Sequence, residues 1–318
     1  MCEGTTNNKK DLSWKIDFVR RKMKESGFQL EDRAYSIFNE HLKDCEIEQN
    51  YHFSDWETSE DRELDLKITY SVADPPAFVD YVFLIECKQL PDSYWSFVRS
   101  RQQRMIFKNS FSIWDKVGRT GRHEKVVDML DPTFKTKGTT CDTYSQSYKE
   151  FLPDGVKGSP DNVKTNNRTD NIRSSEIKLA KALYFENREA LQLANIGRAW
   201  DGAADHIQVF WPIIIFQGNL FEANMQKDPP EIKSIGSAHL RHSSMQNKEN
   251  IQMIVDIIEI DSLPQFIDNK IIPEIAEVKE KCEALWPSYE TDVSSLRKQY
   301  LSGQIRYLKD PLQDLLSE

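Results

Sequence analysis

The sequence contains no long hydrophobic run and is modest in hydrophobic content overall. Of its 318 residues, 39% are hydrophobic and 29% are charged, and the mean hydropathy is -0.63. The longest apolar segment, 209–216, is interrupted by Pro212 and is far shorter than the roughly 20 residues that a membrane span needs. The opening residues, MCEGTTNNKKDLS, are polar and lack the apolar core of a secretion signal. These absences predict a cytoplasmic protein without a membrane partner.

Cysteine is also scarce and scattered. The five cysteines include no pair with C-x-x-C spacing, so neither a disulfide framework nor structural zinc is indicated. Cys87 lies inside an apolar run and is expected to pack as a small apolar residue. Glycine-rich phosphate loops and the H-E-x-x-H zinc motif are absent as well, which removes the P-loop enzymes and the zinc proteases from consideration.

The chain has an excess of acidic charge but one locally basic stretch. The net charge of -9 argues against a protein that coats itself in nucleic acid. The basic residues of the stretch are Arg99, Arg101, Arg104, Lys108, Lys116, Arg119, Arg122 and Lys125. A local basic face is sufficient to dock a phosphate backbone. Helical spacing over 93–114 predicts that Arg99, Arg101, Arg104 and Lys108 lie on an amphipathic helix, either solvated or in contact with phosphates.

The pattern of apolar residues predicts an α/β protein. Helices are expected at 12–43 with a break near Gly27, at 93–114, at 174–195, and from Ser262 to about 285. Strands are expected at 45–53, 62–70, 81–88, 207–216, 220–225, 235–242 and 251–260, with a tight turn at Gly218–Asn219. This order predicts a sandwich in which helices flank a central mixed sheet.

The domain organisation follows from the same reading. We expect a single elaborated domain over 1–318, with a core of about 12–116 and 174–285 that includes extra C-terminal strands and helices. The polar segment of about 131–173 is predicted to be an insertion, because it has few aliphatic residues. Peripheral helices are expected over about 286–318.

Two strand-like segments carry charged residues in apolar surroundings. The segment RELDLKITY contains Asp65, and the segment YVFLIECKQ contains Glu86 and Lys88. Because successive strand side chains alternate between faces, Glu86 and Lys88 share a face, and Asp65 lies opposite its neighbours Leu64 and Leu66. An antiparallel hairpin would bring the two carboxylates and the lysine together.

Such a cluster suits phosphodiester hydrolysis. Mg²⁺ or Mn²⁺ bound by carboxylates neutralises the phosphate, and a nearby lysine positions or activates water. The alternative is a set of cross-strand ion pairs among Asp65, Lys67, Glu86 and Lys88 on a half-exposed sheet. Against that alternative, VFLIECK has the composition of a strand buried on both faces.

The same residues resemble the D…(D/E)-x-K signature of the restriction-endonuclease-like, or PD-(D/E)XK, nuclease superfamily. Asp65 is followed 21 positions later by Glu86, and GFQLEDRAYSIF resembles the glutamate-bearing helix of many members, with Glu31 at the matching place. The residue before Asp65 is leucine rather than proline. The resemblance, which covers about 27–110, implies that Asp65, Glu86 and Glu31 hold the metal and that Lys88 is the catalytic lysine. Gln89 would contact substrate near the scissile phosphate.

Three groups of polar residues offer weaker candidates or alternative roles. Glu31 can instead favour only the helix dipole, and Glu40 on the same helix is a substitute. The histidines form no ligand motif, since His239 and His242 are expected on opposite faces of a strand. The remaining group comprises Asp201, Asp205 and His206, which are expected in a helix-to-strand connection.

The sequence therefore predicts a Mg²⁺- or Mn²⁺-dependent nuclease acting on DNA in a defence or DNA-processing system. The alternative is a non-catalytic module of the same fold that binds DNA or a protein partner. Either a homodimer or a subunit of a larger complex is compatible with the chain.

Overall fold

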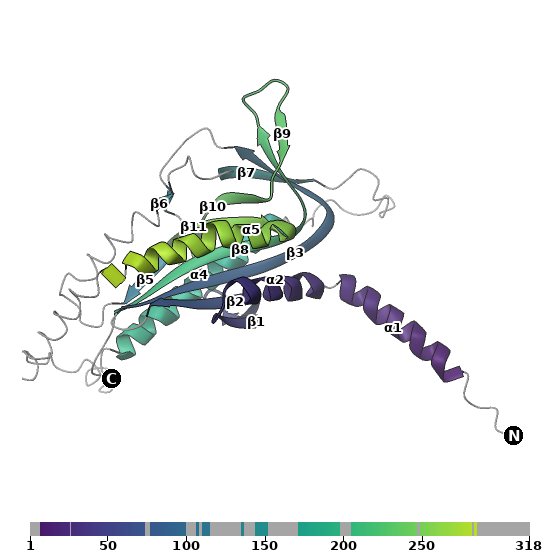
Figure 1. Cartoon of the computed structure of the whole chain (residues 1–318), viewed down its shortest axis with the longest axis horizontal. Helices are drawn as coiled ribbons and strands as arrows, with labels where there is room; N and C mark the ends of the chain where they lie inside the picture. Colours follow the sequence, from purple (N-terminus) through teal and green to yellow (C-terminus); the bar gives the residue numbers. More distant parts are fainter. Residues whose placement is uncertain are drawn as a thin grey trace, which may run out of the picture.

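The fold is taken from a computed structural model of the chain. It describes residues 7–25, 27–73, 77–99, 106–107, 110–114, 135–136, 144–151, 171–197, 205–246, 249–281 and 283–284. Figure 1 shows a twisted central sheet with helices against it and one helix projecting from the body. The chain is an α/β protein with a mixed sheet flanked by helices, as the sequence predicts.

The main sheet has nine strands. They are β1 (Glu46–Ser54), β2 (Asp61–Ala73), β3 (Ala77–Arg99), β5 (Ser110–Trp114), β7 (Tyr144–Phe151), β8 (Asp205–Asn224), β9 (Glu231–Ser234), β10 (Ser237–Gln246) and β11 (Glu249–Glu259). The pairs β3–β8, β8–β11 and β7–β10 are parallel and the others are antiparallel. Since β3 pairs with both β7 and β8, the path β3–β7–β10–β11–β8 closes on itself. Strands β4 (Ile106–Phe107) and β6 (Lys135–Thr136) form a separate pair.

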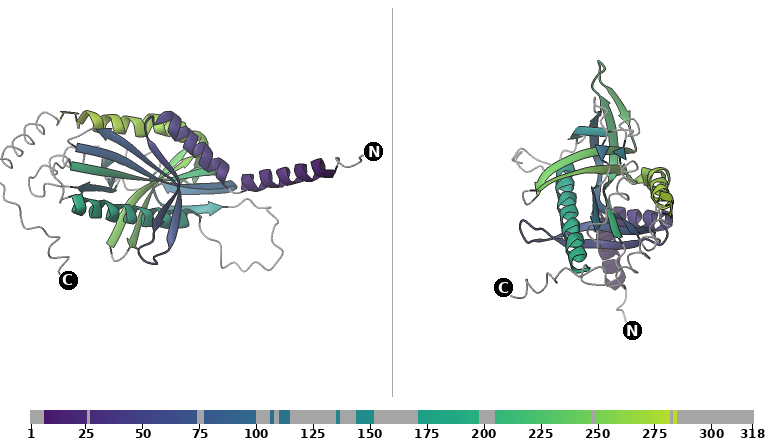
Figure 2. Two further views of the ribbon diagram at one scale, coloured as in Figure 1. Left: turned by 90° about the horizontal axis from the view of Figure 1, so that it is seen from below. Right: turned by 90° about the vertical axis from the view of Figure 1, so that its left-hand side faces the viewer.

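Helices cover both faces of this sheet (Figure 2). One face packs against α2 (Phe28–His41) and against a C-terminal helical segment. That segment comprises η1 (Ile260–Ser262), α5 (Leu263–Phe266), η2 (Ile267–Ile271) and residues 272–281. The other face packs against α4 (Asn171–Gly197). No helix in the described part of the chain is long and apolar enough to cross a bilayer.

The spacing of apolar residues explains how the helices attach. In α2, Leu30, Ala34 and Phe38 recur every fourth residue and are all buried. Gly27 precedes this helix with φ 86°, a left-handed conformation that glycine adopts readily. It separates α2 from α1 (Asn7–Glu25), at the position where the sequence predicts a break.

Strand β3 is longer than the sequence analysis predicts. The helix expected over 93–114 is wrong, because 93–99 continues β3 and 110–114 forms β5. Ser93, Trp95 and Phe97 are buried while the residues between them are partly exposed, which is the period of a strand. Aromatic residues favour the pleated surface of a sheet, and here Trp95 stacks on Phe216 of β8 with ring centroids 3.9 Å apart.

Strand β8 also runs further than expected. Gly218–Asn219 is not a turn, because β8 is continuous from Asp205 to Asn224 and pairs in parallel with most of β3. The glycine is needed for close approach instead. A Cβ at Gly218 would lie 2.3 Å from a ring carbon of Phe216 and 2.7 Å from the carbonyl oxygen of Leu90. Leu90 lies where the β3–β8 register shifts between Gln89 and Tyr94.

The polar segment of about 131–173 is only partly an insertion. Tyr144–Phe151 forms β7, which pairs with β3 and β10 inside the main sheet. The prediction failed here because the backbone of a strand can complete a sheet with few aliphatic side chains. The remaining expected strands and α4 are confirmed, and β9 is an additional short strand. The helices expected over 286–318 lie outside the described residues.

Candidate functional site

The alternation of side chains along β2 is interrupted at Asp65. Leu64 and Leu66 are both fully buried, but they belong to the core clusters on opposite sides of the sheet. The expectation that these two leucines share a face is therefore wrong. The paired strand β1 is irregular at the same level, where Asn50 has φ 53°. This local irregularity leaves Asp65 between two buried neighbours.

The β2–β3 hairpin brings Asp65 to Glu86, as the sequence predicts. Leu66 pairs with Ile85 in antiparallel register, so the next position places Asp65 across from Glu86. The Asp65 carboxylate accepts a hydrogen bond of 2.5 Å from the backbone N–H of Cys87. This bond fixes the carboxylate over β3.

Glu86 is a buried carboxylate held by two lysines. It is 2% exposed, and Lys88 Nζ lies 2.5 Å from its Oε1. Lys178 Nζ of α4 lies 2.6 Å from its Oε2, close enough for an ion pair, although the angles do not make this contact a hydrogen bond. A buried charge requires such compensation, because burial removes its hydration. The site therefore contains a second lysine, Lys178, that sequence reasoning missed.

Glu31 joins the cluster from the first turn of α2. Burial, followed by the charges of Asp65, Glu63 and Glu86, raises the pKa of Glu31 from 4.5 to about 7. The charge of Glu31 therefore interacts with those of the carboxylates on β2 and β3, but no direct contact between Glu31 and Asp65 or Glu86 is seen in the described part of the chain. Glu40 is exposed elsewhere on α2.

Asp65 is perturbed in the same direction. Burial and then the charge of Glu86 raise the pKa of Asp65 from 3.8 to about 6, even though the Cys87 N–H and the lysines Lys178 and Lys88 oppose the change. Near neutral pH, Glu31 and Asp65 are therefore carboxyls that a nearby positive charge would readily ionise. The region has the electrostatic character of a cation site.

Cys87 and Gln89, which flank Lys88 on β3, also border the candidate site. Burial and the nearby carboxylates raise the pKa of the Cys87 thiol, so it stays neutral and packs against the apolar core, as expected. The side-chain oxygen of Gln89 is buried and has no hydrogen-bond partner among the described residues. An unsatisfied amide oxygen beside Lys88 is consistent with the predicted polar contact to a ligand.

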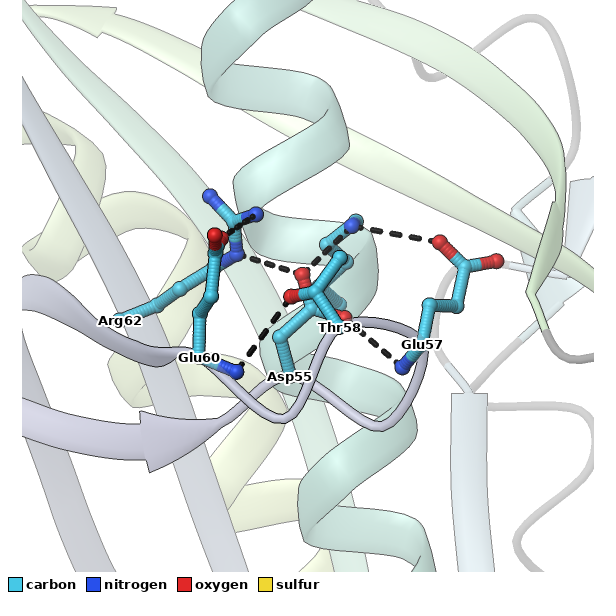
Figure 3. A network of polar contacts seen from close by, with 6 residues as sticks. Asp55, Glu57, Thr58, Glu60 and Arg62 are labelled. Carbon is cyan, nitrogen blue, oxygen red and sulfur yellow. Dashed lines mark hydrogen bonds and ion pairs between the residues drawn. The ribbon is translucent and has the colours of Figure 1, made fainter.

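A separate ion cluster fixes α4, and hence Lys178, in place (Figure 3). Asp55, in the turn between β1 and β2, is buried and lies 2.6 Å from both Lys181 Nζ and Arg62 Nε. Burial would raise the pKa of Asp55, but the bonds from Lys181 and Arg62 hold it below its usual range. Since Lys181 is three residues after Lys178, the contact anchors the helical turn that reaches Glu86.

The structure agrees only in part with the alternative of cross-strand ion pairs among Asp65, Lys67, Glu86 and Lys88. Glu86 and Lys88 do form an ion pair. Lys67, however, points to Glu186 of α4, with Nζ 2.9 Å from Oε1, and lies 4.3 Å from the ring centroid of Tyr51. The charged residues of β2 and β3 therefore belong to two clusters, both completed by α4.

The remaining predicted residues lie outside the described part of the chain or in contact with other groups. Arg101, Arg104 and Lys108 lie outside the described residues, and Arg99 ends β3 rather than beginning a basic helix. His239 and His242 are on opposite faces as predicted, where they contact Asp256 and Glu176 respectively.

The expected connection containing Asp201, Asp205 and His206 is shorter than predicted. Asp205 and His206 already belong to β8. Asp201 lies outside the described residues.

The carboxylates of Asp65, Glu86 and Glu31 are chemically suited to bind a hard divalent cation. Carboxylate oxygens are the ligands that Mg²⁺ prefers, and the pKa values of Glu31 and Asp65 are raised by burial and, after that, by neighbouring carboxylates. Within the described ranges, however, no three His, Cys, Asp or Glu side chains are close enough to form a metal centre. Both Glu86 oxygens instead face lysines.

Comparison with known proteins adds no family to this description. Searches against protein-family models, curated proteins and solved structures give no significant match for the chain.

Proposed function

We propose that the chain is a metal-dependent nuclease of the restriction-endonuclease-like, PD-(D/E)XK kind, and that it acts on DNA. The observation that carries the proposal is the pairing of Asp65 across from Glu86 in the β2–β3 hairpin, with Lys88 Nζ 2.5 Å from Glu86 Oε1. These three residues match the superfamily signature, and the charge of Glu31 on α2 interacts with those of Asp65 and Glu86.

Each residue has a role in this proposal. Asp65, Glu86 and Glu31 would hold Mg²⁺ or Mn²⁺, which supplies charge neutralisation at the scissile phosphate. Lys88 would orient a water molecule and donate a hydrogen bond to the phosphate. The amide oxygen of Gln89 would accept a hydrogen bond from a water molecule near the scissile phosphate. That the substrate is DNA is likewise proposed.

Lys178 extends this set. It lies against the Glu86 oxygen that Lys88 does not contact, so the two ammonium groups balance the buried carboxylate. Binding of a cation would shift that balance and release lysine donors toward an incoming phosphate. In the absence of a cation, the two lysines therefore compensate the buried charge of Glu86.

The experiment is a cleavage assay with plasmid, single-stranded DNA and RNA in Mg²⁺ or Mn²⁺. The test variants are Lys88→Ala and Asp65→Asn, and the matched controls are Lys233→Ala and Asp61→Asn at exposed positions of β9 and β2. We expect at least a hundredfold loss of rate in the test variants, since general acid–base groups contribute roughly 10²–10⁴-fold. Cleavage that survives both test substitutions would remove the assignment of the site.

A second function is favoured by one observation. Because lysines occupy both Glu86 oxygens, the cluster is also stable as a purely structural ion network. The chain would then be a non-catalytic module of the same kind that binds DNA or a protein. Binding without cleavage of any substrate, unchanged by removal of divalent cations, would favour this alternative.

A further inference from the structure

Helix α1 exposes an apolar stripe to solvent. Figure 1 and Figure 2 show it extending away from the sheet and the other helices. Ile16, Val19 and Met23 are 43%, 51% and 49% exposed, and neither hydrophobic core formed by the described residues includes any residue of α1. Helices in proteins gain most of their stability from packing such a stripe against another surface, so this one is suited to a partner.

The spacing of the stripe is that of a coiled-coil seam. Ile16, Val19 and Met23 are separated by three and four residues, which places them at successive a, d and a positions of a heptad. By sequence, Leu12 occupies the preceding d position. At 3.6 residues per turn, Trp14 and Phe18 fall on the far side of the helix, where their rings stack 6.0 Å apart.

The charges beside the seam determine the kind of partner. Lys15 and Lys22 occupy the g positions and Arg20 an e position, so the seam is bordered by positive charge on both sides. Residues 7–25 contain seven basic and three acidic side chains, in a chain whose net charge is -9. The acidic residues Asp11, Asp17 and Glu25 fall at neither e nor g, and Asp17 forms a solvent-exposed ion pair of 3.3 Å with Arg20.

Self-pairing of α1 is disfavoured by these charges. In a parallel pair, each g position faces an e position of the partner, so Lys15 would face Arg20 of a second copy. In an antiparallel pair, g faces g and e faces e, which again sets like charges together. Pairing with a helix whose flanking positions are acidic converts every one of these contacts to attraction.

Other anionic partners fit less well. A nucleic acid would engage Lys15, Arg20 and Lys22 but leave the aliphatic seam in water. An interfacial membrane helix carries its aromatic residues on the apolar face, whereas Trp14 and Phe18 lie opposite the seam. A narrow aliphatic stripe with charge directly on both sides is the pattern of a helix pair.

We propose that α1 is a docking helix for an amphipathic helix of another protein, with apolar a and d positions and acidic e and g positions. The proposal does not depend on nuclease activity. It describes a surface remote in the chain from Asp65 and Glu86, and it assigns to α1 the recruitment of a partner.

The test uses the full chain and two fluorescent 21-residue peptides. Both have isoleucine and leucine at a and d, and they differ only in glutamate or lysine at e and g. We expect the acidic peptide to bind about tenfold more tightly at low salt, since the flanking contacts of Lys15, Arg20 and Lys22 change together from repulsion to attraction. Fluorescence anisotropy measures both affinities.

Three variants make the test specific. Replacing Lys15, Arg20 and Lys22 by glutamate should reverse the preference between the two peptides. Ile16→Asp combined with Val19→Asp should abolish binding of both, while Trp14→Ala, outside the seam, should leave it unchanged. Unaltered thermal unfolding of each variant confirms that the sheet and its helices are intact.

Four outcomes would overturn the proposal. They are equal binding of the two peptides, absence of binding at concentrations up to the millimolar range, concentration-dependent self-association that Ile16→Asp removes, and binding of anionic vesicles or oligonucleotides through the seam while neither peptide binds. Loss of nuclease activity alone bears on the proposed function and not on this surface.

Discussion

Replacement of Asp65 by asparagine should stabilise the protein when no cation is bound. The side chain lies among carboxylates, and its pKa rises from 3.8 to about 6 on folding. A shift of this size corresponds to about 3 kcal/mol of unfavourable free energy when the group is ionised in the folded state. Asparagine keeps an oxygen that can accept the Cys87 N–H bond but carries no charge. We therefore expect a gain that approaches, and does not exceed, about 3 kcal/mol at pH 8.

The sign and the pH window follow from the direction of the shift. The raised pKa means that the folded state of the wild type binds the proton more tightly than the unfolded state. Its contribution to stability is therefore fully present below pH 3.8 and is lost as the pH rises through about 6. The advantage of Asp65→Asn should be largest at pH 8 and about half as large at pH 5.

Urea unfolding of both proteins at pH 5 and pH 8 without divalent cations measures this advantage. Asp61→Asn, at an exposed position of the same strand, is the matched control and should show no comparable pH-dependent gain. Equal stability of Asp65→Asn and wild type at pH 8, or an advantage that is the same at both pH values, would refute the electrostatic account. Added Mg²⁺ should then stabilise the wild type more than the variant, by linkage of binding to folding.

Two further substitutions test the frame around the site. Asp55→Asn should cost about 3 kcal/mol at pH 7, because Lys181 and Arg62 lose their charged partner, and the cost should begin to decrease below pH 3.8 and disappear only as the pH falls through the depressed pKa of Asp55, so that it is smaller at pH 3 but still present. Urea unfolding at pH 7 and pH 3 measures both effects. Gly218→Ala should cost about 1–3 kcal/mol through its clash with Phe216 and the Leu90 carbonyl, and an unchanged melting temperature would contradict the assigned close approach.

The candidate site was predictable where its parts are local in sequence. The hairpin carrying Asp65, Glu86 and Lys88 follows from alternating apolar residues and a proline-containing connection. The helix carrying Glu31 follows from the spacing of Leu30, Ala34 and Phe38. In each case, a periodic pattern reports directly on which face is buried.

The contribution of α4 was not predictable in the same way. Lys178 reaches Glu86 only because α4 packs on the face of the sheet opposite to α2, and this placement depends on the topology of the whole chain. A lysine on an amphipathic helix normally indicates solvent, since its long side chain can reach water from a partly buried position. Its sequence neighbours therefore gave no sign of the contact.

The error at 93–99 has a more specific cause. The order Tyr94, Trp95, Phe97 and Val98 satisfies both a helical and a strand pattern over so short a stretch. Tertiary pairing decides between them, because β8 pairs with β3 over 94–98 as well as over 77–89. The same pairing explains Gly218. Its local sequence predicts a turn, but its lack of a side chain instead allows two long strands to approach closely.

The parallel pairing of β3 with β8 also determines when the protein can complete its core during folding. Ala77 pairs with Asp205 and Val98 with Ala223, so the central pair closes a very long loop of intervening chain. The entropy of that closure opposes pairing until other contacts hold the ends together. On the ribosome, the β1–β3 hairpins and α2 emerge with one edge of β3 still open, and the candidate site lacks α4 and β8. The carboxylates can therefore gather early, but their lysine counterpart on α4 and the solvent-excluding strand arrive only when residues 171–224 have been made.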